Sequence, residues 1–100
     1  MKAVLAGTVI AEVDDAETIL IEGNHYFPPS ALMAGEWTES PTPYTCPWKG
    51  ASQYYTLELD GRTHVDLAWA YPTLYPSAIE RVGRDFSGYL AFDPRVQVGP

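Results

Sequence analysis

The dipeptide Asp60-Gly61 constrains this chain more than any other feature, because it lies between two segments that both alternate apolar and polar residues. Residues 53–59 precede the dipeptide and residues 63–71 follow it, each with the period of two that is typical of a strand with one buried face. Asp-Gly is among the preferred centres of a two-residue hairpin turn. The sequence therefore predicts an antiparallel hairpin over residues 53–71.

Further short strands are predicted on both sides of this hairpin. Residues 4–13 are rich in β-branched side chains and are broken by Ala6-Gly7, which predicts a bent strand or a hairpin. After a turn at Asp14-Asp15, residues 18–21 form an apolar run with the length of a buried strand. A tight turn over residues 22–25 would lead to a partner strand that begins at Tyr26-Phe27.

Prolines and glycines divide the rest of the chain. Pro28-Pro29-Ser30 ends the preceding strand and begins a single helical turn, and residues 36–50 are expected to be mostly loop, with a short edge strand at most. Pro76 begins a short amphipathic helix that ends before Gly83. Residues 88–92 and 95–98 are expected to close the chain as two short strands.

Composition limits the kinds of partner. Residues 1–100 suffice for one domain with its own core, and no apolar run is long enough to span a membrane. A net charge of −7 opposes binding to nucleic acid and to anionic membranes, since both are polyanions. The single cysteine predicts a reducing compartment, and we expect a cytoplasmic protein with no cofactor and no bound metal.

The segment Thr45-Cys46-Pro47-Trp48-Lys49-Gly50-Ala51 concentrates the residues best suited to chemistry. Lys49 could bind a carboxylate or phosphate of a ligand, or form a structural ion pair with Glu22 or Asp66. Cys46 could be a nucleophile activated by Lys49, although burial as a small apolar residue is the more frequent role of cysteine. Glu22 is either held inside or caps backbone amides of its own turn.

Four segments, in this order, carry a resemblance to a known family. They are Tyr26-Phe27-Pro28, the segment at residues 45–51 with Tyr54-Tyr55, Ala68-Trp69-Ala70-Tyr71-Pro72, and Gly88-Tyr89-Leu90-Ala91-Phe92. Together they closely resemble domain-of-unknown-function family 427 over essentially the whole chain. The resemblance implies a mostly β fold, similar to the Mss4-like or β-tent folds, with two antiparallel sheets of short strands and one or two short helical segments.

The resemblance also brings a nucleotidyltransferase-like label and relatives that bind zinc. The label implies two-metal phosphoryl transfer, which needs closely spaced carboxylates. Asp14 and Asp15 are adjacent and would point to opposite faces of an extended chain, and no glycine-rich phosphate loop precedes a helix. No Cys-x-x-Cys pair is present to bind zinc. The sequence therefore supports neither chemistry.

Three roles follow from these features. The first is a binding domain whose aromatic pocket takes a small polar or anionic ligand; the second is an enzyme that uses Cys46 as a nucleophile or redox thiol; the third is a protein-interaction module, as a monomer or weak homodimer. The pocket would have a floor of large aromatic side chains and Lys49 at its mouth. Its expected residues are Lys49, Trp48, Trp69, Tyr71, Tyr26, Tyr55 and Glu22.

Overall fold

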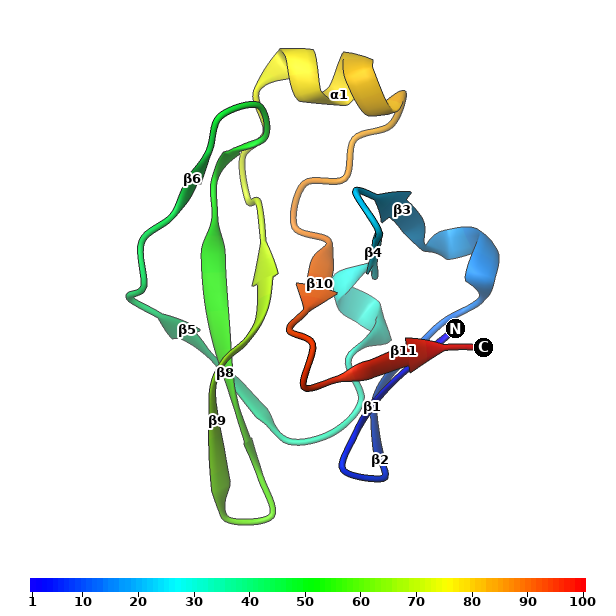
Figure 1. Cartoon of the computed structure of the whole chain (residues 1–100), viewed down its shortest axis with the longest axis vertical. Coiled ribbons are helices and arrows are strands. Elements are labelled where there is room, and N and C mark those ends of the chain that lie inside the picture. The colour runs from blue at the N-terminus through cyan, green and yellow to red at the C-terminus, as the bar shows by residue number, and fades with distance from the viewer.

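The computed structural model describes all 100 residues and is built almost entirely from short strands (Figure 1). The only α-helix is α1 (Pro76–Val82), and two 3-10 turns are η1 (Asp15–Glu17) and η2 (Pro29–Ala31). The strands are β1 (Lys2–Leu5), β2 (Thr8–Glu12), β3 (Ile19–Ile21), β4 (Asn24–Tyr26), β5 (Glu36–Ser40), β6 (Thr45–Cys46), β7 (Gly50–Ala51), β8 (Gln53–Leu59), β9 (Arg62–Ala70), β10 (Leu90–Phe92) and β11 (Gln97–Gly99).

The predicted hairpin is confirmed as β8 and β9, which pair antiparallel and are joined at Asp60-Gly61. Both turn residues have positive φ, +52° and +75°, as a type I′ turn requires. This turn matches the right-handed twist of the two strands and so sets their register, with Leu59 opposite Arg62. The long strand β9 rises from the hairpin turn at the bottom of Figure 1 and ends at Ala70, so Trp69 is its penultimate residue and Tyr71 follows it directly.

Two larger antiparallel sheets form the fold, as expected, and two short ribbons accompany them. The four-stranded sheet has the order β10-β9-β8-β5, and the three-stranded sheet has the order β11-β1-β2. The pairs β3-β4 and β6-β7 are separate two-stranded ribbons. The chain is therefore mostly β with antiparallel sheets and one helix. No helix in it is long and apolar enough to cross a membrane.

Several segments differ in detail from the sequence predictions. Residues 36–40 form the edge strand β5 beside β8, as the sequence allowed, but β6 and the start of β7 also fall within residues 36–50, so less of this segment is loop than expected. The strand β3 is not buried throughout, because Leu20 is 63% exposed between two buried isoleucines. The turn that follows comprises only Glu22 and Gly23, because Asn24 and His25 already belong to β4.

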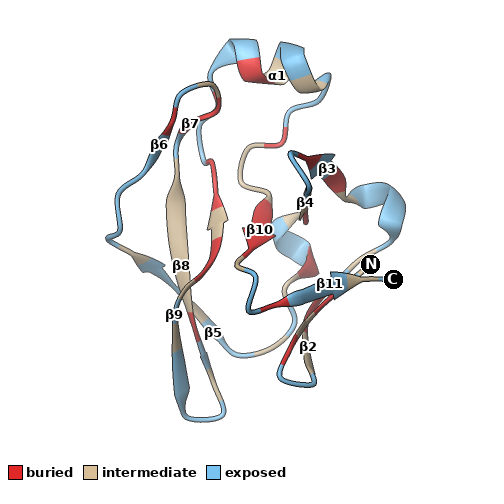
Figure 2. Cartoon of the chain, in the orientation of Figure 1, coloured by how far each residue is buried: buried red, intermediate tan, exposed pale blue.

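The core consists of two clusters of buried side chains. The larger cluster includes Ile10, Phe27, Leu57 and Leu67, and contains side chains from both larger sheets. The second cluster has nine buried residues and joins the β3-β4 ribbon to helix α1. Figure 2 shows these buried positions along β10, near the end of β9 and in one short stretch of α1, where Ala78 is the buried residue. Next to the second cluster, residues at the ends of β4, β8 and β9 line one cavity together with residues that flank the β6-β7 ribbon.

Candidate functional site

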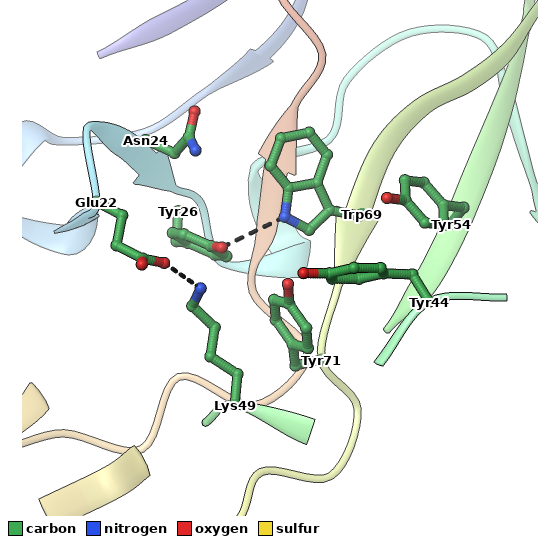
Figure 3. A pocket seen from close by; sticks show the side chains of 8 residues that line it. All are labelled: Glu22, Asn24, Tyr26, Tyr44, Lys49, Tyr54, Trp69 and Tyr71. Carbon is green, nitrogen blue, oxygen red and sulfur yellow. Dashed lines mark hydrogen bonds and ion pairs between the residues drawn. The ribbon is translucent and has the colours of Figure 1, made fainter. Parts of the chain in front are cut away.

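A cavity of about 260 Å³ opens where these strand ends meet. We call it the tyrosine cavity, because four of the eight residues that line it are tyrosines (Figure 3). Its other walls carry one ammonium, one carboxylate, one amide and one indole. The lining residues are Glu22, Asn24, Tyr26, Tyr44, Lys49, Tyr54, Trp69 and Tyr71.

The backbone of Lys49 is held in position by a neighbouring segment of the chain. The backbone N–H of Tyr75 donates a hydrogen bond to the Lys49 carbonyl at 3.0 Å, which ties the β6-β7 turn to the segment before α1. The next residue, Gly50, has φ +124°, and a Cβ there would lie 2.9 Å from the carbonyl oxygen of Thr73. Only glycine allows this approach without strain, so Gly50 lets the two segments meet and fixes where Lys49 begins.

The Lys49 ammonium donates a hydrogen bond to Oε1 of Glu22, and the two groups form an ion pair across 27 residues of sequence. The pair is asymmetric, because the Lys49 side chain is 5% exposed and the Glu22 side chain is 54% exposed. This ion pair is one of the two predicted for Lys49. Asp66, the other candidate partner, instead accepts a hydrogen bond from the Thr42 hydroxyl at 2.7 Å.

The ion pair shifts the titration of both partners. Hydrogen bonding and charge from Lys49 lower the pKa of Glu22, with smaller contributions from Trp48 and Arg81. Burial alone lowers the pKa of Lys49, but the hydrogen bond to Glu22 and the nearby Tyr26 and Cys46 outweigh it, so its pKa is raised. Lys49 is therefore a buried cation and Glu22 its anion at neutral pH. The Glu22 carboxylate binds this ammonium, and no backbone amide of its turn donates to it.

Trp48 stacks with two cations. Lys49 Nζ lies 4.5 Å from the Trp48 ring centroid, and Arg81 Cζ lies 4.2 Å from the same centroid. Lys49 Nζ is also 5.3 Å from the ring centroid of Tyr71. These distances permit cation–π attraction, which is strongest where the cation has lost water. The aromatic rings therefore stabilise the Lys49 ammonium together with Glu22.

The tyrosine hydroxyls are the remaining polar groups of the cavity. Trp69 Nε1 donates a hydrogen bond to the Tyr26 hydroxyl at 3.3 Å, whereas the hydroxyls of Tyr44, Tyr54 and Tyr71 have no hydrogen-bond partner in the protein. Figure 3 shows the Tyr44 and Tyr71 hydroxyls directed at the space between Tyr26 and Trp69. Burial raises the pKa of Tyr54 and Tyr71, so both hydroxyls stay protonated at neutral pH and can donate.

Five of the seven residues assigned to the pocket from sequence line this cavity: Lys49, Trp69, Tyr71, Tyr26 and Glu22. Lys49 lies in its wall rather than at its mouth, since the residue is 4% exposed. Trp48 lies on the other side of Lys49 and lines a neighbouring cavity. Tyr55 packs against the larger core cluster instead.

Three lining residues were not anticipated: Asn24, Tyr44 and Tyr54. The sequence holds a partial signal for Tyr54: adjacent strand residues point to opposite faces, so only one of Tyr54 and Tyr55 can reach the cavity, but alternation does not say which. Tyr44 lies in a loop, and its carbonyl accepts hydrogen bonds from the Ser52 backbone N–H at 2.8 Å and from the Ser52 hydroxyl at 3.0 Å. No periodicity marks that position.

Cys46 is buried in the second core cluster and does not line the tyrosine cavity. Its Sγ lies 3.9 Å from Lys49 Nζ, within the range of a weak hydrogen bond to sulfur. The thiol is thus close to a cation but covered by protein. Elsewhere, no group of three or more His, Cys, Asp or Glu side chains is arranged to hold a metal ion.

Comparison with known proteins gives one finding. No curated protein matches this sequence. Residues 1–99 match a family model described as a domain of unknown function, DUF427. The match covers every segment that builds the tyrosine cavity, from Glu22 in the β3-β4 turn to Tyr71 after β9, as well as helix α1. The chain therefore belongs to the DUF427 family.

Proposed function

We propose that the tyrosine cavity binds a small polar or anionic ligand. The observation that carries this proposal is the set of unpartnered hydroxyls of Tyr44, Tyr54 and Tyr71, which share one cavity with the Lys49 ammonium. These hydroxyls are not among the buried polar atoms that lack a partner, so water can reach them, and a ligand that enters the cavity can replace that water. Aromatic walls with a few convergent polar groups are the usual make-up of a small-molecule site.

The size of the cavity limits the ligand. Its volume of about 260 Å³ is slightly below the range of roughly 300–1,000 Å³ that is usual for drug-sized ligands. The ring of Tyr54 is tilted by 52° against that of Trp69, with centroids 6.4 Å apart, so these two rings form an angled wall. Such a wall suits a flat, compact molecule.

The test is a thermal-shift screen of small acids, alcohols and amides on the wild-type protein and on Tyr71→Phe, followed by NMR of the Trp69 indole N–H. Tyr71→Phe removes one hydroxyl and keeps the ring, so a ligand of the cavity should stabilise the variant less than the wild type. Tyr75→Phe is the matched control, because Tyr75 is 44% exposed and lies outside the cavity. A screen in which no compound moves the Trp69 signal would refute the proposal.

A second candidate function is an enzyme that uses Cys46. One observation favours it: Lys49 Nζ lies 3.9 Å from Sγ, and a neighbouring cation stabilises a thiolate. Burial of Cys46 works against it, because the thiol lacks direct access from the tyrosine cavity. Iodoacetamide labelling decides between the two roles. A structural thiol should react only after unfolding, whereas a nucleophile should react in the native protein at neutral pH.

The third role, as a protein-interaction module, would use the open edge of β5. This strand pairs only with β8, so its other side is free. However, it carries Glu36 and Glu39, and charged side chains on an edge oppose strand addition. Sedimentation measures this role directly: a homodimer that depends on β5 should dissociate in a Thr38→Pro variant, because proline cannot complete a strand pair.

A further inference from the structure

Glu22 lines two neighbouring cavities. One is the tyrosine cavity, and the other is a surface cavity of about 330 Å³ on the far side of Trp48. We call the second one the arginine cavity; it is lined by Leu20, Ile21, Glu22, Trp48, Arg81 and Val82. The Glu22 carboxylate therefore lies at the boundary between a space that holds Lys49 and a space that holds Arg81.

The two cations, Lys49 and Arg81, differ in their interaction partners. Lys49 is ion-paired with Glu22, whereas Arg81 forms no ion pair and only stacks on Trp48. Both cations contact the same indole ring, at 4.5 Å and 4.2 Å from its centroid. The charge of Arg81 also contributes to lowering the pKa of Glu22. Glu22 thus lies within the field of both cations and shares a cavity with Arg81.

The two members of the existing ion pair differ in freedom. The Lys49 side chain is 5% exposed and its backbone is tied to the segment before α1, so the ammonium is fixed. The Glu22 side chain is 54% exposed and projects from a two-residue turn. Glu22 and Gly23 both have positive φ, +53° and +82°, as in a type I′ turn, whose two central positions favour Asn, Asp or Gly. The turn itself does not call for glutamate, which points to a role for its side chain.

We propose that the ligand is a small carboxylate whose anionic group replaces Glu22 on Lys49, while the Glu22 carboxylate moves to Arg81. This proposal rests on the proposed function of the tyrosine cavity and adds the ligand class and the movement that admits it. Every charge keeps a partner in the exchange, which matters because an unpaired buried charge is costly. The hydroxyls of Tyr44 and Tyr71 are placed to donate to the incoming oxygens.

The charge of the site favours a singly charged ligand. Lys49 is the only cation that lines the tyrosine cavity, and the whole chain carries a net charge of −7. One ammonium matches one carboxylate, whereas a doubly charged phosphate would leave one negative charge uncompensated in a negative protein. The aromatic walls suit an apolar or aromatic body attached to the carboxylate.

The test measures the binding of benzoate and of its neutral analogue benzyl alcohol. NMR of the Trp69 indole N–H at constant ionic strength reports the binding of each compound. Glu22→Gln removes the competing carboxylate and should strengthen benzoate binding about fivefold, the equivalent of an ion pair worth roughly 1 kcal/mol. Arg81→Met removes the alternative partner of Glu22 and should weaken benzoate binding about threefold by the same reasoning. Glu12→Gln, an exposed acid on β2, changes the net charge equally and is the control.

A double variant separates the exchange from simple charge effects. In the Glu22→Gln protein, Arg81→Met should no longer affect benzoate binding, because no carboxylate remains to move. An equal effect of Arg81→Met in both backgrounds would overturn the exchange. If the Glu22→Gln protein binds benzoate more weakly than the Glu12→Gln protein does, the exchange is overturned as well. Unchanged affinity for benzyl alcohol in every variant would confirm that the cavity itself is intact.

The outcomes also separate this inference from the proposed function. If benzyl alcohol moves the Trp69 signal and benzoate does not, the carboxylate class is wrong and the cavity remains a binding site. If benzoate binds equally to the wild type and Glu22→Gln, the site takes a carboxylate but the exchange is wrong. If neither compound moves the Trp69 signal and the screen of small molecules also fails, the proposed function fails with the inference.

Discussion

Trp69 Nε1 donates a hydrogen bond to the hydroxyl of Tyr26 at 3.3 Å, and this bond joins β9 to β4 across 43 residues of sequence. Tyr26 is 2% exposed, and its ring packs edge-on against Phe86 with centroids 5.7 Å apart. The hydroxyl of Tyr26 is therefore the one polar atom of a buried ring, and it connects the four-stranded sheet to the β3-β4 ribbon at the tyrosine cavity.

Tyr26→Phe should lower the free energy of unfolding by about 1–2 kcal/mol, because it removes the acceptor of the Trp69 indole and keeps the ring in place. Urea unfolding followed by tryptophan fluorescence measures the change. Tyr75→Phe removes an exposed hydroxyl and should change the free energy of unfolding by less than about 0.5 kcal/mol. Equal values for the two variants would mean that the hydrogen bond contributes nothing to stability.

The two partners of the Lys49–Glu22 ion pair should respond differently to substitution. Glu22→Gln leaves a buried ammonium without its anion and should cost about 1 kcal/mol, a value reduced by the solvent exposure of Glu22. Lys49→Met removes the buried charge and leaves Glu22 free to be hydrated, so its cost should be smaller. Unfolding in urea near neutral pH compares the two. A larger loss for Lys49→Met would contradict this account of the pair.

Acid should weaken the same ion pair. The folded-state pKa of Glu22 lies below its ordinary value of 4.5. Between these two pKa values the native protein therefore binds fewer protons than the unfolded chain. The contribution of the pair is complete above pH 4.5 and is lost as pH falls through the lowered pKa. The pKa values of Asp15, Asp85 and Asp93 are also lowered, so the wild type loses stability from several groups.

Glu22→Gln isolates the share that belongs to Glu22. The free energy of unfolding of this variant should fall less steeply with acid than that of the wild type, and the two curves should converge below pH 4.5. Parallel curves over the whole acid range would show that Glu22 titrates alike in the folded and unfolded chains.

Local patterns predicted the elements better than they predicted the site. The Asp60-Gly61 turn depends on neighbouring residues only, so its hairpin could be predicted from the sequence. The choice between Tyr54 and Tyr55 could not, because alternation places them on opposite faces without stating which face is buried. A bulge between Tyr55 and Leu57 also shifts the register of β8 against β9, which breaks the simple alternation.

The charged pair shows the same limit over a longer range. The sequence allowed either Glu22 or Asp66 as the partner of Lys49, and only the packing of the β6-β7 turn against the β3-β4 ribbon decides between them. Trp48 is adjacent to Lys49 in sequence, yet it lines the arginine cavity rather than the tyrosine cavity. Two residues that are adjacent in one sequence motif can therefore line different cavities.

Gly50 provides a test of how Lys49 is positioned. Gly50→Ala should cost roughly 2–3 kcal/mol, because a Cβ would lie 2.9 Å from the Thr73 carbonyl oxygen at a φ of +124°. Gly61→Ala also has positive φ but meets no atom within 4 Å, so it should cost only about 1–2 kcal/mol. Thermal or urea unfolding of both variants measures the difference. A cost for Gly50→Ala no greater than for Gly61→Ala would mean that the two segments separate easily.

Tyr71 should make the protein sensitive to alkali. Burial raises the folded-state pKa of Tyr71 above its ordinary value of 10.0, so above that pH the unfolded chain releases a proton that the native protein retains. The native protein then binds more protons than the unfolded chain, and the free energy of unfolding falls as pH rises. Tyr71→Phe cannot ionise in either state, so its stability should fall less between neutral pH and pH values above 10.0 than that of the wild type. Tyrosinate absorbance measures the ionisation directly. Near pH 10.0 the native wild type and the native Tyr71→Phe protein should show the same tyrosinate absorbance, because Tyr71 is still protonated there. Identical alkaline stability curves for wild type and variant would mean that the Tyr71 hydroxyl titrates as if exposed to solvent.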